Sequence, residues 1–189
     1  MIRSTDGGET WQDCSAHLIK LSEQEHLKSM IVSDTYAEGM LDVHAITICP
    51  ARPDEVIVAL RMGLFRSTDK GETWQDMELG RFSPTTYGRD VKMSAQDPKT
   101  LYAALSVAAA SHDGGVYRSV DAGETWQRFD KVQVHGTIMS IGLHPGDADQ
   151  VYIGARYNGE VFGTTDGGAT WSEMPLPGAV KDIYALSCG

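Results

Sequence analysis

Acidic and basic side chains recur at matching places along this chain, where they could do acid–base or anion-binding chemistry. Three aspartates, Asp42, Asp90 and Asp182, each stand beside the start of a short apolar run. Two arginines, Arg61 and Arg156, each follow another apolar run in the same register. A pair of carboxylates can act as general acid and base, and arginines can hold an anionic group. The other interpretation is structural, with the acids bonding to turns and pairing with the arginines.

Residues peculiar to one copy of this pattern are the better candidates for ligand binding, because a catalytic or binding residue is normally unique rather than repeated. Histidine, arginine and tyrosine side chains can each donate hydrogen bonds to a polar ligand. These further candidates are His44, Arg89, His112, Asp113 and Tyr157.

The charge balance and the lack of other motifs exclude several classes of function. The 189 residues include 16 Lys and Arg against 26 Asp and Glu, a net charge of −10. Nucleic acid is therefore not an expected partner, since phosphate binding needs clustered positive charge. The motifs of phosphate, metal and nucleophile sites are missing, so neither a cofactor nor a metal is predicted. Without a signal peptide or an apolar run of membrane-spanning length, the default location is cytoplasmic, or exported if the native chain is longer.

All four tryptophans lie in copies of one octapeptide, (S/T)-x-D-x-G-x-T-W. The aspartate can accept hydrogen bonds from backbone N–H groups further along the turn, and the glycine permits a positive φ. Each tryptophan is expected to bury its ring against a neighbouring unit. These residues are predicted to hold hairpins together rather than to contact a ligand. They are Asp6, Gly8, Trp11, Asp69, Gly71, Trp74, Asp121, Gly123, Trp126, Asp166, Gly168 and Trp171.

The octapeptides divide the chain into similar units of short strands. A β-prone run, a turn with Pro and Asp, and a second β-prone run precede each of the last three copies. Four short antiparallel strands in about 45–60 residues are typical of one blade of a β-propeller. The sequence thus predicts an all-β fold of four-stranded antiparallel blades, about four in number, in a single region over 1–189. Its parts are blades near 43–77, 91–129 and 138–174, blade ends 1–16 and 181–189, and an insertion over 17–42.

Two of these parts carry more detailed predictions. The end segment 182–187 aligns with 42–47 and is expected to form the first strand of a further blade. In the insertion, a capping box at Ser22–Glu25 and apolar residues at helical spacing predict a short helix near 23–31.

The octapeptides resemble the Asp-box (BNR) repeat of sialidase-like propellers. The wider pattern also resembles the sortilin-type receptors, the xyloglucanase-type glycoside hydrolases and the photosystem II assembly-factor propellers. Rings of roughly six to eight blades are usual in such families, so the resemblance implies a partial ring, which a homodimer would complete. A closed four-bladed ring is the alternative. The resemblance also implies that ligands bind at the mouth of the central channel, on the face away from the boxes.

The leading hypothesis for function is a non-catalytic propeller scaffold that binds a protein or a small polar, carbohydrate-like ligand on the channel face. The alternative is a glycoside-hydrolase-like enzyme, whose carboxylates would come from Asp42, Asp90 and Asp182. A truncated fragment without an independent function is the third hypothesis. Sialidase chemistry is disfavoured, because only two arginines fall in register and Phe65-Arg66 runs straight into a box rather than into an Arg-Ile-Pro motif.

Overall fold

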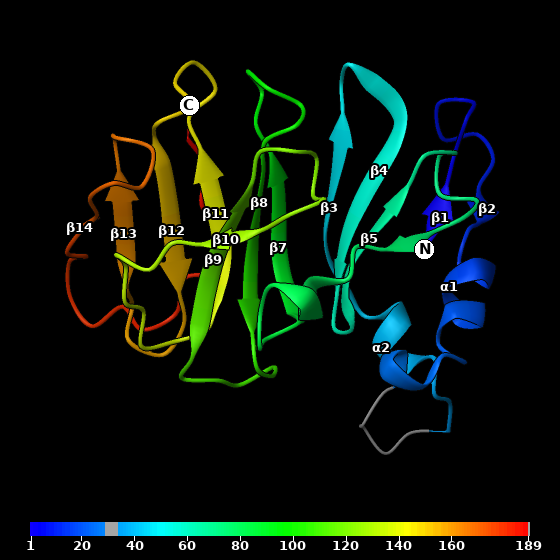
Figure 1. Cartoon of the computed structure of the whole chain (residues 1–189), viewed down its shortest axis with the longest axis horizontal. Coiled ribbons are helices and arrows are strands. Elements are labelled where there is room, and N and C mark those ends of the chain that lie inside the picture. Colours follow the sequence, from blue (N-terminus) through cyan, green and yellow to red (C-terminus); the bar gives the residue numbers. More distant parts are fainter. Residues whose placement is uncertain (29–33, 189) are drawn as a thin grey trace.

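The computed structural model describes residues 1–28 and 34–188, and its blades stand side by side along an arc (Figure 1). Three sheets have four antiparallel strands each, and the strands within a sheet follow the order of the chain. A hairpin of β1 (Ile2–Arg3) and β2 (Gln12–Asp13) lies at one end of the arc. This arrangement confirms the all-β fold and the partial propeller. The strands of the three blades are β3 (Val43–Cys49), β4 (Arg52–Leu60), β5 (Gly63–Ser67), β6 (Gln75–Asp76), β7 (Tyr87–Met93), β8 (Leu101–Ser106), β9 (Gly114–Ser119), β10 (Gln127–Arg128), β11 (Ile138–Leu143), β12 (Val151–Ala155), β13 (Val161–Thr164) and β14 (Ser172–Glu173).

The blades pack face to face through buried aliphatic and aromatic side chains. Ile57 of β4 and Leu101 of β8 belong to one core between the first and second blades. Ile141 of β11 belongs to a second core, between the second and third blades. Side chains of a strand alternate between its two faces, so a strand that is buried throughout needs packing on both. The six residues of β8 are all buried, as expected for a strand between two neighbouring blades.

Each first strand contains a β-bulge near its start. The pairing of β3 with β4 passes over His44, that of β7 with β8 passes over Arg89, and that of β11 with β12 passes over Met139. The strands β3, β7 and β11 also contact one another in turn, so they form the inner edge of the arc. A bulge bends the strand and re-aims one side chain. The three bulged residues are therefore structural equivalents at this inner edge.

The insertion before β3 is partly helical, and its first helix begins earlier than the sequence predicts. It contains α1 (Ala16–Leu21), the 3-10 turn η1 (Glu25–Leu27) and α2 (Glu38–Leu41). Ser22 ends α1 rather than beginning a helix, because its N–H and its hydroxyl both donate back to carbonyls of α1. Of the helix predicted near 23–31, the described part contains only the 3-10 turn η1, and the positions from 29 onward lie outside the described residues.

The box tryptophans differ in burial. Trp126 is 6% exposed in the core shared with the first blade, and Trp74 is 1% exposed under Leu18 and Met40 of the insertion. Trp11 is 60% exposed, since no element in the described part of the chain covers its ring. The prediction that every box tryptophan is buried is wrong for Trp11.

The two chain ends lie at opposite ends of the arc, so the ring is open (Figure 1). The segment over 181–188 carries no strand, which contradicts the prediction for 182–187. It still lies against the third blade, because the N–H of Ile183 donates to the Ala155 carbonyl (3.3 Å) and the N–H of Leu186 donates to Ser140 Oγ (3.0 Å). Within residues 1–28 and 34–188, no helix has the length and apolar character needed to cross a membrane.

Candidate functional site

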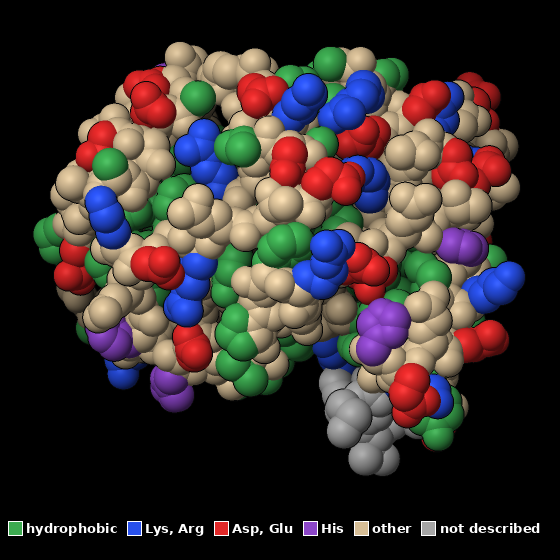
Figure 2. All heavy atoms as spheres, in the orientation of Figure 1, with side chains coloured by type: hydrophobic (Ala, Val, Ile, Leu, Met, Phe, Trp, Pro, Cys, Tyr) green, Lys and Arg blue, Asp and Glu red, His purple; other side chains and the backbone are tan. Residues whose placement is uncertain are grey.

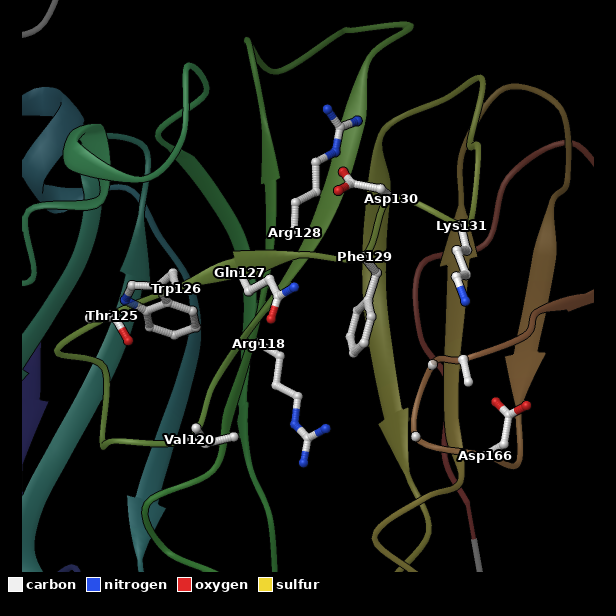
Figure 3. A pocket seen from close by; sticks show the side chains of 13 residues that line it. Arg118, Val120, Thr125, Trp126, Gln127, Arg128, Phe129, Asp130, Lys131 and Asp166 are labelled. Atoms are coloured by element: carbon white, nitrogen blue, oxygen red, sulfur yellow. The ribbon is translucent and has the colours of Figure 1, made fainter.

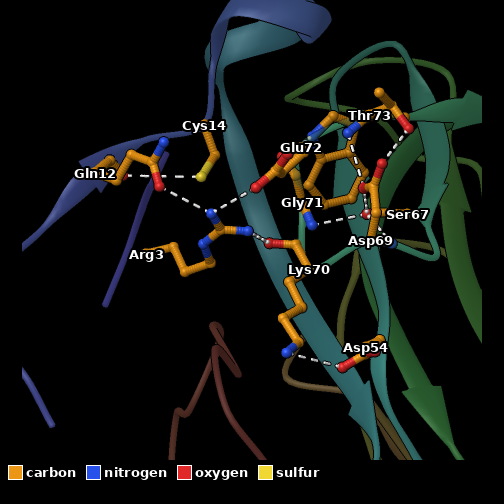
Figure 4. A network of polar contacts seen from close by, with 11 residues as sticks. Arg3, Gln12, Cys14, Asp54, Ser67, Asp69, Lys70, Gly71, Glu72 and Thr73 are labelled. Atoms are coloured by element: carbon orange, nitrogen blue, oxygen red, sulfur yellow. Dashed lines mark hydrogen bonds and ion pairs between the residues drawn. The ribbon is translucent and has the colours of Figure 1, made fainter. Parts of the chain in front are cut away.

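The Asp-box carboxylates make the same hydrogen bonds in all four copies. In the second copy, Asp69 Oδ1 accepts from the Ser67 hydroxyl (2.8 Å) and the Thr73 N–H (2.8 Å), and Oδ2 accepts from the Thr73 hydroxyl (2.6 Å) (Figure 4). The Trp74 indole donates to the Gly71 carbonyl (3.0 Å). The bonds from Thr73 hold the pKa of Asp69 at about 2. Because these groups are satisfied within the turn, the boxes act as hairpin locks.

An arginine before each of the first two boxes links one hairpin to the next. Arg3 donates to the Lys70 carbonyl (2.9 Å) and forms an ion pair with Glu72 (3.0 Å), both in the second box (Figure 4). Arg66 lies 3.5 Å from Glu124 in the third box. The same arginine–glutamate contact therefore recurs between neighbouring hairpins.

The strand register changes the interpretation of Asp90. The bulges align Arg89 with His44, so Asp90 is equivalent to Ala45 rather than to Asp42. Asp90 is 4% exposed, and its Oδ2 accepts the N–H of Ile141 in the next blade (2.8 Å). Burial raises the pKa of this carboxyl. Asp90 thus joins two blades through a buried hydrogen bond, and the sequence alignment that set it beside Asp42 is wrong.

Asp42 lies in a network of charged and aromatic groups at the start of β3. The Arg61 guanidinium holds Asp42 Oδ2 through Nη2 (2.5 Å) and Nε (3.0 Å), and it also contacts Glu38 (3.3 Å). His44 Nε2 is 3.4 Å from the same carboxylate oxygen, while its Nδ1 faces the Gly88 carbonyl at 2.6 Å. A carbonyl only accepts, so Nδ1 carries the proton. The imidazole is thus held in one orientation.

Arg89 is the most deeply buried cation of the inner edge. It is 9% exposed, its guanidinium donates to the Ala109 carbonyl, and its charge lies 4.7 Å from the centre of the Tyr87 ring. Tyr87 in turn stacks on His44 with ring centres 5.2 Å apart. Burial lowers the pKa of Arg89, and the charges of Arg156 and Asp42 also act on it. Arg89 is therefore within electrostatic reach of Asp42, next to the first blade, and of Arg156, at the end of a strand of the third blade.

The third blade supplies an arginine that contacts two tyrosine rings. The Arg156 guanidinium is 4.9 Å from the Tyr157 ring centre, 5.0 Å from that of Tyr184, and 3.5 Å from Asp182. Tyr157 has a positive φ of 83° and donates its N–H to Asp182 (3.2 Å). The His112 ring lies 5.7 Å from that of Tyr157. Loop 107–113 and the end segment thus meet around Tyr157.

Most of the sequence-predicted candidates therefore gather along one edge, which we call the channel rim. Asp113 lies apart from it, with an exposed side chain 3.8 Å from Arg128 of the outermost strand. Glu38 of α2 belongs to the network but was missed, because the insertion does not share the repeat pattern. No group of three or more His, Cys, Asp or Glu suited to a metal occurs among the described residues. The channel rim comprises Asp42, His44, Arg61, Tyr87, Arg89, His112, Arg156, Tyr157, Asp182 and Tyr184.

Comparison with known families agrees with the repeat pattern. The BNR/Asp-box repeat model matches residues 2–13, and the Sortilin-Vps10 model (sortilin, neurotensin receptor 3) matches 114–188. A xyloglucanase of Paenibacillus sp is 27% identical over 170 residues, covering 70% of this chain and 16% of that protein. Xyloglucanase Xgh74A of Acetivibrio thermocellus is 26% identical over 170 residues, covering 70% of this chain and 20% of that protein. The chain thus spans about a fifth or less of the length of these curated relatives.

Solved structures share the fold at lower identity. The GH74 xyloglucanase from Xanthomonas campestris superposes with a TM-score of 0.66 at 13% identity, over 92% of this chain and 26% of that one. YCF48 bound to D1 peptide superposes with a TM-score of 0.56 at 16% identity, over 95% and 48%. The chain is therefore built on an Asp-box (BNR) β-propeller scaffold. Within that class, the curated matches show a relation to xyloglucanase-type glycoside hydrolases.

Proposed function

We propose that this chain is a non-catalytic binding module whose channel rim holds a saccharide chain. The observation that carries the proposal is the pair of tyrosine rings beside the Arg156 guanidinium, Tyr157 at 4.9 Å and Tyr184 at 5.0 Å, with Tyr184 58% exposed. Aromatic rings offer apolar faces to the C–H face of a sugar ring, and guanidinium groups donate to its hydroxyls. The similarity to xyloglucanases supports a carbohydrate as the ligand class.

The state of the three candidate carboxylates favours binding over catalysis. A glycoside hydrolase needs one carboxyl free to protonate the leaving group and a second facing it across the substrate. Asp42 is held by two nitrogens of Arg61, and Asp182 contacts both Arg156 and the N–H of Tyr157. Asp90 is buried against backbone N–H groups. All three carboxylates already have partners within the protein.

Calorimetric titration with xyloglucan oligosaccharides tests this proposal. We expect Tyr184→Ala to weaken binding roughly fivefold to tenfold, because an aromatic contact contributes about 1 kcal/mol beyond its area. Tyr36→Ala is the matched control, since Tyr36 is 70% exposed on the insertion and its ring lies beside Lys28 (5.8 Å) rather than beside Arg156. Equal loss in both variants, or no binding by the unmodified chain, would contradict the proposal.

The second candidate is a glycoside-hydrolase-like enzyme, favoured by the xyloglucanase relatives. A reducing-sugar assay on the same oligosaccharides separates it from the binding module. We expect no turnover. Turnover that disappears in Asp42→Asn or Asp182→Asn would establish the enzyme instead. A protein ligand and the cytoplasmic location remain predictions from the sequence.

A further inference from the structure

The arginine–glutamate contact between hairpins is interrupted at its third repetition. Arg3 and Arg66 each reach a glutamate of the following box, Glu72 and Glu124. The next arginine in the series is Arg118, but the fourth box has Ala169 where the other boxes have glutamate. In the described part of the chain, no carboxylate lies within ion-pair distance of Arg118, although its charge contributes to lowering the pKa of Asp97. Arg118 therefore lacks the glutamate that pairs with the equivalent arginine in the other two hairpin pairs.

A groove opens where the glutamate side chain would lie. It has a volume of about 490 Å³ and runs between the second and third blades, on the outer side of the arc (Figure 3). Its walls include Arg118, Phe129, Lys131 and Ala169. The equivalent groove between the first and second blades, lined by Arg66 and Glu124, has about 150 Å³. The larger groove therefore coincides with the missing side chain.

The local charge of this groove differs from that of the whole molecule. Acidic and basic side chains are interspersed over the outer face (Figure 2). In the groove, Arg118 is half-buried and lies 5.9 Å from the Tyr102 ring centre. Of the two lining acids, Asp166 already binds Thr170 through both oxygens, and Asp130 is exposed at the rim of the groove. Since the chain carries a net charge of −10, a ligand with many negative charges would be repelled at long range.

We propose that this groove binds a glutamate side chain of a partner peptide, with its carboxylate on Arg118 in the place that Glu72 and Glu124 take in the other hairpin pairs. Charge-assisted hydrogen bonds between guanidinium and carboxylate supply the affinity, and Phe129 supplies an apolar wall for the glutamate methylenes. The site lies on the box side of the blades and is separate from the channel rim. Its occupant carries one carboxylate in a Gly-Glu-Thr context, as the first three boxes do.

An NMR titration of the labelled full chain with acetyl-Gly-Glu-Thr-amide tests the proposal, with acetyl-Gly-Gln-Thr-amide as the neutral probe. We expect backbone amide shifts at Gly168 and Ala169 with the acidic peptide, and binding weaker by roughly tenfold or more with the neutral one. Arg118→Gln should reduce the affinity to that of the neutral peptide. Arg66→Gln is the matched control and should leave it unchanged.

Two substitutions at Ala169 distinguish the effect of an added negative charge on peptide binding from the effect of a larger side chain. Ala169→Glu restores the repeat partner of Arg118 and should abolish peptide binding, whereas Ala169→Gln should retain most of it. Equal binding of both peptides, or an unchanged affinity in Arg118→Gln, would overturn the proposal. A titration with glucuronate that shifts the same amides while the peptide does not would overturn the assignment of a peptide partner.

Discussion

At the scale of single residues, the box aspartates show how local hydrogen bonds set both stability and its pH dependence. Asp121 accepts from the Thr125 hydroxyl (2.5 Å), the Thr125 N–H (2.9 Å) and the Ser119 hydroxyl (2.7 Å). These bonds favour the ionised form and lower its pKa from 3.8 to about 2. A carboxyl with a lowered pKa in the folded state stabilises the fold above its unfolded pKa, and this contribution disappears as the pH falls through the folded value.

We therefore expect the melting temperature to fall as the pH drops from about 4 toward about 2. Asp121→Asn should lower the melting temperature at neutral pH and flatten this acid dependence, because the amide cannot gain or lose the charge. Asp130→Asn removes a carboxylate of the same hairpin without touching the box, and should leave the dependence intact. Thermal unfolding followed by circular dichroism from pH 2 to 7 provides the measurement. An equally steep acid dependence in Asp121→Asn would contradict this account.

At the scale of elements, the bulges and the end segment decide which side chains reach the channel rim. The segment over 181–188 is held by few backbone bonds, one of which runs from the N–H of Gly159 to the Lys181 carbonyl (2.8 Å). Gly159 has a positive φ of 67°, and a Cβ there would overlap the Val180 carbonyl. Glycine is required at this position for two reasons, the backbone conformation and the close approach.

Gly159→Ala should therefore detach the end segment from the third blade. We expect a loss of about 1–3 kcal/mol in the free energy of unfolding, and faster hydrogen exchange at Ile183 and Leu186. The matched control is Gly178→Ala, since Gly178 has a similar φ of 74° but no atom within 4 Å of a Cβ. If hydrogen exchange at Ile183 and Leu186 is equally fast in both variants, the loss comes from the strained backbone conformation and not from overlap with the Val180 carbonyl.

At the scale of the whole molecule, the arc leaves one blade face uncovered. Ile46 of β3 is 53% exposed, whereas its equivalents in the next two blades, Val91 and Ile141, are fully buried. Ile48 is also 53% exposed on the same strand. The homodimer predicted from the sequence would cover this face with a second copy.

Light scattering tests the homodimer directly, because the chain has a mass of 20.6 kDa. A dimer should have twice this mass, and Ile46→Asp should convert it to a monomer, since a buried charge without a partner costs several kcal/mol. Ile19→Asp is the control, because Ile19 is 43% exposed on α1. A monomeric mass for the unmodified chain would exclude the homodimer.

How well a rim residue could be placed from the sequence depends on how clearly the neighbouring residues mark its strand and turn. Arg61 with Asp42, and Arg156 with Asp182, could be paired from the sequence because the repeat places each arginine directly after a second strand and aligns the segment at Asp182 with the one at Asp42. The sequence alignment misplaced Asp90 because the register of β7 depends on a β-bulge at Arg89. No residue pattern in the sequence indicates this bulge. The α-helix of the insertion was not predicted at its place, because Ser22 is of a residue type that caps helix N-termini but here bonds backward to the end of α1.

The sequence by itself determined the Asp-box hairpins, because each box is closed by bonds among residues within eight positions of one another. The repeat pattern predicted the four-stranded blades, and the resemblance to Asp-box propellers implied the partial ring. The tertiary structure decided which elements lie against each hairpin and which side chains they bury. Trp11 is exposed while Trp74 is buried, and Asp90 joins two blades. Among the described residues, Arg118 has no ion-pair partner, although Arg66 pairs with Glu124. These outcomes depend on the strand register and on which element lies against each blade, and neither is encoded within one repeat.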